Sequence, residues 1–130
     1  MIKEMIVEEY KDINYLIEDV VFIHKQLFPQ ATLASQIAKY EEESEELQLA
    51  NTMDEIVEEF ADLFIVACGI RRFSLVLGTD LLKYLINTVK HNDDRMTLMK
   101  AVCEKMNKNQ KRDWGETYDG YYKHTVHSVH

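Results

Sequence analysis

Residues 32–70, TLASQIAKYEEESEELQLANTMDEIVEEFADLFIVACGI, decide the fold of this chain. Thr32 has the side chain of a helix N-cap, and the helix that it starts is predicted to run to about Ala50. After a short turn, Thr52 is followed three residues later by Glu55, which is the spacing of a capping box and predicts the start of another helix. Two amphipathic helices joined by so short a turn are expected to pack as an antiparallel hairpin.

Helical periodicity extends on both sides of this segment. Apolar residues recur every three or four positions over residues 2–27, which predicts a first helix across that whole range. The second hairpin helix is expected to end before Gly78, and two further helices are expected to begin near Thr79 and Asp93. No strand-like alternation of useful length is present. The sequence therefore predicts an all-α fold, a bundle of about five helices built round the hairpin and completed by oligomerisation.

Length and composition indicate one domain. The chain has 130 residues, of which 46% are hydrophobic, and only one proline and four glycines interrupt it. This length is enough for one hydrophobic core and too short for two ordinary domains. We expect one domain over residues 1–114, followed by a polar, tyrosine-rich C-terminal tail over residues 115–130.

The composition also narrows the partners and the location. A formal net charge of −8 disfavours binding to a nucleic-acid duplex, which depends on lysine and arginine. No apolar run of about 18 residues is present, so no membrane partner is expected. Cys68 and Cys103 both lie in apolar, helical contexts, which is typical of buried thiols. A reducing cytoplasm is the location that fits best.

The first hairpin helix carries a run of glutamates with different helical phases. At about 100° per residue, Glu43 falls at the edge of the apolar stripe, while Glu41, Glu42 and Glu45 point toward water. Glu46 lies beside Glu43, three residues further on. A glutamate run is usually a solvated helix surface, so the phase of Glu43 is the informative observation.

The second hairpin helix places an acidic residue within its apolar arc. Glu59 projects into the same arc as Ile56 and Leu63, and Asp62 lies on its border. Burying a carboxylate costs several kcal/mol without compensation, and we expect no lysine or arginine of either helix to share this arc. A divalent cation is therefore predicted.

Four carboxylates would surround that cation: Glu43 and Glu46 from one helix, and Glu59 and Asp62 from the other. Such hard oxygen ligands suit Mg²⁺, with Mn²⁺ as the other candidate, and Mg²⁺ in sites of this kind also takes phosphate oxygens. A di-iron carboxylate site is disfavoured, because no histidine follows a glutamate at the required Glu-x-x-His spacing.

These motifs resemble those of a known family. Glu42-Glu43-x-x-Glu46 and Glu59-x-x-Asp62 are similar to the EExxE and ExxD motifs of the MazG-like, all-α nucleoside triphosphate pyrophosphohydrolases, and the segment from Lys105 to Arg112 is similar to their basic KxxxNxxR stretch. The resemblance covers about residues 33–114. A register shifted by one residue, Glu41-Glu42-x-x-Glu45, also fits the letters but turns the ligands away from the helix seam.

The resemblance implies that a nucleoside triphosphate is hydrolysed to the monophosphate and pyrophosphate, with Mg²⁺ as cofactor and water attacking the α-phosphorus. Glu46 or Glu42 would be the general base, and the residues alone do not separate them. Lys105, Asn109 and Arg112 share one helical face and would contact the β and γ phosphates. Without the acidic motifs, they would be interpreted as an ordinary basic helix C-terminus.

Base recognition and assembly are less marked in the sequence. His24, Phe28 and Gln36 are the candidates for base contact, although Phe28 could instead pack the helix end. The resemblance implies a homodimer or homotetramer, and the apolar face over residues 82–89 is expected to need cover. The alternative from another class is a non-catalytic helical module that senses a metal or nucleotide, or that serves as an interaction partner.

Overall fold

A computed structural model of the chain describes residues 3–112, 114–118 and 121–124. Five α-helices follow one another in this part, preceded by the short 3-10 turn η1 (Val7–Glu9) and followed by two short strands. They are α1 (Ile13–Leu27), α2 (Leu33–Leu49), α3 (Met53–Phe73), α4 (Leu75–Thr88) and α5 (Asn92–Lys111), with the strands β1 (Trp114–Tyr118) and β2 (Tyr121–His124). The predicted all-α class is confirmed.

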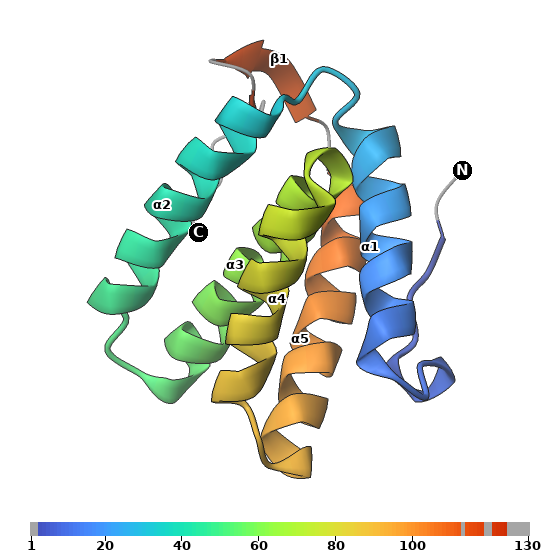
Figure 1. Cartoon of the computed structure of the whole chain (residues 1–130), viewed down its shortest axis with the longest axis vertical. Helices are drawn as coiled ribbons and strands as arrows, with labels where there is room; N and C mark the ends of the chain where they lie inside the picture. The colour runs from blue at the N-terminus through green and yellow to red at the C-terminus, as the bar shows by residue number, and fades with distance from the viewer. Residues whose placement is uncertain (1–2, 113, 119–120, 125–130) are drawn as a thin grey trace.

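Helix α3 is the centre of the bundle. It packs against α1, α2, α4 and α5, and it runs in the direction opposite to α2 after the turn at residues 50–52 (Figure 1). From Ala61 to Ile70 every residue of α3 except Asp62 is buried. A helix that is apolar on all sides requires such a central place. The start of α3 is different, since Ile56, expected on the apolar face, is 39% exposed.

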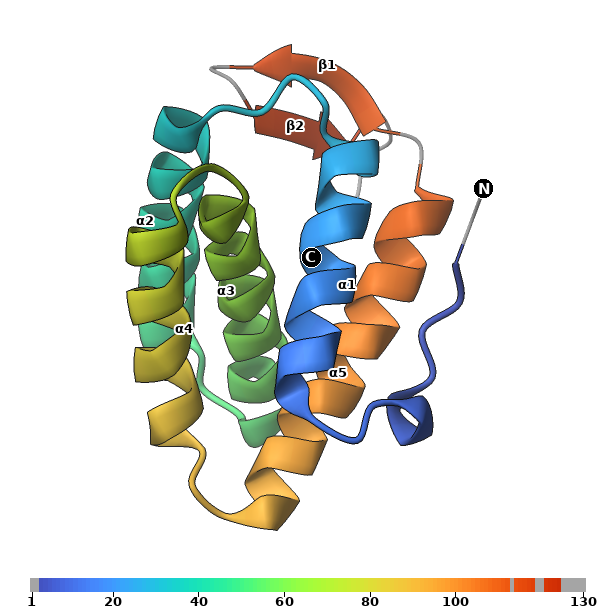
Figure 2. The ribbon, with the colours of Figure 1, turned by 45° about the vertical axis from the view of Figure 1, so that its right-hand side comes forward.

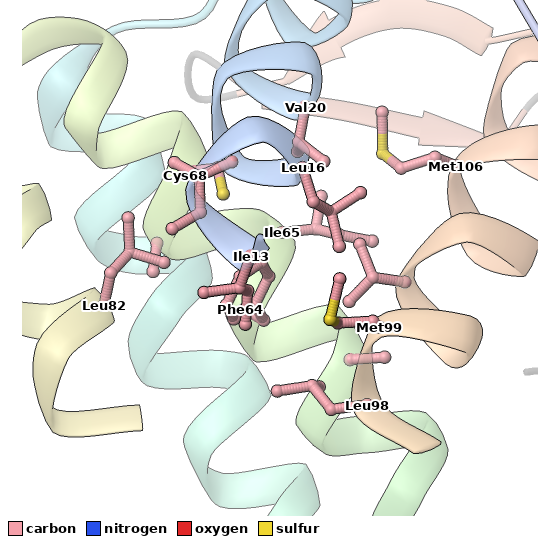
Figure 3. Close-up of a cluster of buried hydrophobic side chains, with 14 of the residues drawn as sticks. Ile13, Leu16, Val20, Phe64, Ile65, Cys68, Leu82, Leu98, Met99 and Met106 are labelled. Carbon is pink, nitrogen blue, oxygen red and sulfur yellow. The ribbon is translucent and has the colours of Figure 1, made fainter. Parts of the chain in front are cut away.

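The core lies between α1, α3, α4 and α5 (Figure 3). Leu16 of α1 and Phe64 of α3 are completely buried, and Met99 of α5 and Leu82 of α4 are 5% and 3% exposed. Removing a buried aromatic side chain such as that of Phe64 typically costs about 3–5 kcal/mol. This packing holds α3 and α5 in fixed relation to each other.

The prediction of one helix over residues 2–27 is wrong at its start. Helix α1 begins at Ile13, because Asp12 has extended backbone angles and its side chain caps the first turn. The segment before it is held by α5 instead. Asn107 accepts a hydrogen bond from the N–H of Met5 at 2.7 Å and donates one to its carbonyl at 3.0 Å.

The boundary between α3 and α4 also differs from the prediction, which put it at Gly78. The break comes at Ser74, which ends α3 and caps α4 by accepting a hydrogen bond from the N–H of Leu77 at 3.3 Å. Gly78 lies inside α4, where a Cβ atom would overlap the backbone of Arg71. The glycine therefore permits close contact of two helices and does not end one.

The segment expected to be a tail without regular structure forms an antiparallel β-hairpin from β1 and β2. The hairpin lies across the end of the bundle where α1 ends and α2 begins (Figure 2). It packs against α2. Residues 125–130 of the expected tail lie outside the described residues.

The apolar face of α4 that was expected to need cover from another copy is already covered within the chain. Leu82 and Leu85 are 3% and 2% exposed, and Ile86 and Val89 pack against the same core. The expectation was wrong because α3 occupies that face. Exposed apolar residues lie elsewhere, at the start of α4, where Leu75 is 64% exposed.

Two further features concern the cysteines and the apolar character of the helices. Cys68 and Cys103 are free thiols and both are buried, as predicted. Among the helices of the described part, none combines the length and the apolar character needed to cross a membrane.

Candidate metal centre

Three glutamates from two helices meet at the seam between α2 and α3. Glu43 and Glu46 come from α2, and Glu59 comes from α3. One carboxylate oxygen of each lies within 4.8 Å of the other two. Residues three apart on one helix lie on the same side of it, so Glu43 and Glu46 both face α3. The antiparallel course of α3 brings Glu59 opposite them (Figure 1).

Two oxygen atoms of this cluster are buried without a hydrogen-bond partner among the described residues. They are Oε2 of Glu43 and Oε2 of Glu59, and Glu43 as a whole is only 6% exposed. An unpartnered buried acceptor typically costs about 1–3 kcal/mol. Convergent carboxylate oxygens of this kind are a hard donor set, which fits Mg²⁺ or Mn²⁺.

The pKa values of the clustered glutamates are raised by burial and by the neighbouring carboxylates. Burial, together with the charge of Asp62, raises the pKa of Glu43 to about 8. Burial and a hydrogen bond with Glu46 raise the pKa of Glu59 to about 7. Two carboxyl groups can share a hydrogen bond only when one of them is protonated. Protons therefore occupy part of the cluster near neutral pH when no cation is present.

Asp62 lies beside these three glutamates but faces a lysine. Its Oδ2 is 3.2 Å from Nζ of Lys105 on α5, and the same ammonium group is 2.9 Å from Oε1 of Glu58. Burial raises the pKa of Asp62 even though Lys105 works against the shift. The group of three close oxygens does not include Asp62. The structure thus brings all four predicted ligands to one seam, with three converging and the fourth paired to α5.

One expectation about the charges is wrong, since a lysine of α2 does share the arc. Lys39 Nζ lies 3.3 Å from Oε1 of Glu43 and 3.6 Å from Oε1 of Glu42. Its side chain is only 28% exposed. The spacing of Lys39 four residues before Glu43 was the signal that could have identified it. The ammonium groups of Lys39 and Lys105 therefore contact four carboxylates, those of Glu42, Glu43, Glu58 and Asp62.

The remaining glutamates of α2 follow their helical phases. Glu41 and Glu45 are exposed, and the side chain of Glu42 is 44% exposed. The register based on Glu43 and Glu46 therefore directs carboxylates into the seam, and the register shifted by one residue directs Glu41 and Glu45 to solvent. Glu42, one of the two candidate bases, reaches the cluster through its contact with Lys39.

The predicted phosphate-contact residues lie along α5 at increasing distance from the carboxylates. Lys105 is within the cluster, as described above. Asn109 is 9% exposed one turn further along, and its Oδ1 accepts a hydrogen bond from Nη1 of Arg112 at 3.3 Å. Arg112 is the C-cap of α5. A row of two cations and an amide thus leads away from the carboxylate cluster.

The three candidates for base contact lie together where α1, α2 and α3 meet. His24 and Gln36 are 3% and 4% exposed, and Nε2 of the histidine lies 3.1 Å from Oε1 of Gln36. The rings of His24 and Phe28 meet edge to face, with centroids 5.0 Å apart. Burial, followed by the charge of Arg72, lowers the pKa of His24 to about 4, so its ring is neutral at pH 7.

Arg72 and Gly69 complete this junction, and neither was identified in the sequence. Nη1 of Arg72 lies 3.2 Å from Nδ1 of His24 and donates a hydrogen bond to the carbonyl of Phe28 at 2.7 Å. A histidine with its proton on Nε2 satisfies both neighbours, donating to Gln36 and accepting from Arg72. A Cβ at Gly69 would lie 2.6 Å from Nε2 of His24 and nearer still to Gln36. These partners are far apart in sequence, so local spacing gives no signal for them.

No protein-family model, curated protein or solved structure matches the chain.

Proposed function

We propose that this protein is a Mg²⁺-dependent nucleoside triphosphate pyrophosphohydrolase, which cleaves an NTP or dNTP to the monophosphate and pyrophosphate and so removes particular nucleotides from the pool. The convergence of Glu43, Glu46 and Glu59, with two buried oxygens lacking a partner, is the observation that supports it most. The arrangement of acidic and basic residues agrees with the motifs that resemble the MazG-like family.

Each group of the centre has a role in this proposal. Glu43, Glu46, Glu59 and Asp62 would hold Mg²⁺, which orients the triphosphate and neutralises negative charge on the transferring group. Glu46 or Glu42 would accept the proton of the attacking water at a carboxylate oxygen.

Basic residues would hold the leaving pyrophosphate. Lys105 lies at the carboxylates already, paired with Glu58 and Asp62, and it would turn toward a phosphate once a cation replaces it as their counter-charge. Asn109 and Arg112 would contact the phosphate further along α5. We assign base contact to His24, Phe28 and Gln36, with Phe28 the most accessible of the three.

The experiment is a substrate panel. The protein is incubated with each common NTP and dNTP and Mg²⁺, and the release of pyrophosphate and monophosphate is followed. Glu59→Gln should reduce turnover by about a hundredfold, because it removes a carboxylate that would hold Mg²⁺, and changes to the groups that support a metal site cost up to a factor of about that size. Glu45→Gln is the matched control, since Glu45 is an exposed neighbour of Glu46 and should leave turnover unchanged.

Three outcomes would count against the proposal. Release of orthophosphate in successive steps would show attack at the wrong phosphorus. Loss of activity in Glu45→Gln would favour the shifted register. Nucleotide binding without any release of pyrophosphate would indicate a non-catalytic sensor.

We further propose that the enzyme acts as a homodimer or homotetramer in a reducing cytoplasm. Leu75 and Val76, which are 64% and 74% exposed at the start of α4, provide apolar surface that association would cover. Sedimentation should show a species larger than the monomer, and Val76→Glu should shift it toward the monomer. The two unpaired, buried cysteines support the assignment to a reducing compartment.

A further inference from the structure

The junction of His24, Gln36 and Gly69 lies on the same helix seam as the carboxylates. Gln36 and Glu43 are seven residues apart on α2, and Asp62 and Gly69 are seven residues apart on α3. Seven residues are two helical turns, or about 10 Å along the axis. Because the two helices run in opposite directions (Figure 1), the junction and the carboxylate cluster are two contact points of one helix pair.

The junction ties α2 to both α1 and α3 at its own contact point. Gln36 on α2 is buried against α3 where Gly69 has no side chain, and its Oε1 lies 3.1 Å from Nε2 of His24 on α1. Any Cβ at position 69 would overlap both side chains. Glycine at position 69 therefore leaves room for the buried His24–Gln36 pair, and α1 holds Gln36 in place by a buried hydrogen bond.

We propose that Gly69 and the His24–Gln36 pair are positioning elements that set the register of α2 on α3 and thereby bring Glu43 and Glu46 opposite Glu59. This inference rests on the proposed function, since it assigns these residues a task in building the metal centre. It requires no contact between the junction and any ligand. Interiors are close-packed, so a displacement at one contact of a rigid helix pair is carried to the next.

The test compares two glycines that are both crowded. Gly69→Ala places a Cβ against the side chains of Gln36 and His24, whereas Gly78→Ala places one against the backbone of Arg71 at the α3–α4 contact, outside the α2–α3 seam. The affinity of the carboxylate cluster for Mn²⁺ is measured without any nucleotide, from the decrease of the electron paramagnetic resonance signal of free Mn²⁺. The backbone amide chemical shifts of Glu43 and Glu46 in the metal-free protein report whether these residues have moved relative to α3.

We expect Gly69→Ala to weaken Mn²⁺ binding about tenfold, the lower limit of the loss seen when supporting residues of metal sites are changed. It should also shift the two amide signals, whereas Gly78→Ala should leave both the affinity and these signals unchanged. If Gly69→Ala does not fold, Gln36→Leu replaces it, since leucine fills a similar volume but cannot hydrogen-bond to His24.

Wild-type affinity in the Gly69 variant, or an equal loss in the Gly78 variant, would overturn the inference. If the unaltered protein binds no Mn²⁺, the proposed metal centre fails, and the NMR signals alone then decide on the register. If the amide signals of Glu43 and Glu46 shift in Gly69→Ala and not in Gly78→Ala, the role of Gly69 in the register is supported. If these signals do not shift in Gly69→Ala, that role is rejected.

Discussion

His24 responds to pH in the direction opposite to Glu43 and Glu59, and it is the simplest of the three. Its pKa is lowered from 6.5 in the unfolded chain to about 4 in the folded protein. Between these values the unfolded state carries a proton on His24 that the folded state does not, so the contribution of His24 to the free energy of unfolding falls as pH decreases from 6.5 to 4. This fall is about 3 kcal/mol.

NMR of the histidine ring provides the measurement. The ring signals of His24 should remain those of a neutral imidazole with its proton on Nε2 down to about pH 4. An exposed histidine of the same chain, His91, serves as the internal comparison. A midpoint for His24 near 6.5 would show that its ring is accessible and not held between Gln36 and Arg72.

Glu43 and Glu59 produce the opposite dependence at higher pH. Their pKa values rise from 4.5 to about 8 and about 7 on folding, so the folded state binds more protons than the unfolded state above pH 4.5. Without metal, the free energy of unfolding should therefore fall as pH rises from 6.5 to 8, a window that lies above the titration of His24. Glu43→Gln should reduce this fall.

Urea unfolding in the presence of a chelator measures this effect. Glu41→Gln is the matched control, since Glu41 is an exposed residue of the same helix and should keep the wild-type pH dependence. Identical pH profiles for Glu43→Gln and the unaltered protein would mean that Glu43 is ionised and solvated, which would remove the physical argument for a cation.

At the scale of residues, helical phase predicted which acidic side chains face the seam. The lysines that pair with them were not all predicted. Helical phase indicated that Glu43 turns inward and that Glu41 and Glu45 turn outward, as the burial of these residues now shows. It missed Lys39, although this residue lies four positions before Glu43 and therefore on the same side of α2.

At the scale of elements, most helices could be predicted because caps and apolar periodicity are local signals. Thr32 and Thr52 cap the helices that they were predicted to cap. The start of α1 could not be predicted in this way. Residues 3–6 have helical periodicity, but they are extended because side chains of α5 satisfy their backbone groups, more than one hundred residues away in sequence.

This N-terminal contact yields a prediction about α5. Asn107 makes two hydrogen bonds with the backbone of Met5, so Asn107→Ala should lower the free energy of unfolding by about 1–3 kcal/mol. The neighbouring Lys108 is exposed, and Lys108→Ala should change the stability by less than about 0.5 kcal/mol. Chemical denaturation of both variants tests this. Equal stabilities would show that the N-terminal segment contributes nothing to holding α5.

At the scale of the whole molecule, the central position of α3 explains both what the sequence predicted and what it missed. Its apolar residues on all sides require neighbours all round, and α1, α2, α4 and α5 supply them. The same arrangement covers the face of α4 that seemed to need another copy of the chain. Which faces of several amphipathic helices meet is a tertiary property, and the periodicity of each helix alone does not determine it.

The carboxylate cluster holds Glu43, the buried acidic residue of the described part of the chain, and cation binding there should release protons. Titrating Mg²⁺ calorimetrically into chelator-treated protein at pH 7, in two buffers of different ionisation enthalpy, measures binding and proton release together. The account predicts saturable binding with release of about one proton per ion, given the raised pKa values of Glu43 and Glu59. Binding should be lost in Glu59→Gln and kept in Glu45→Gln. No binding by the unaltered protein, or undiminished binding in Glu59→Gln, would contradict the account.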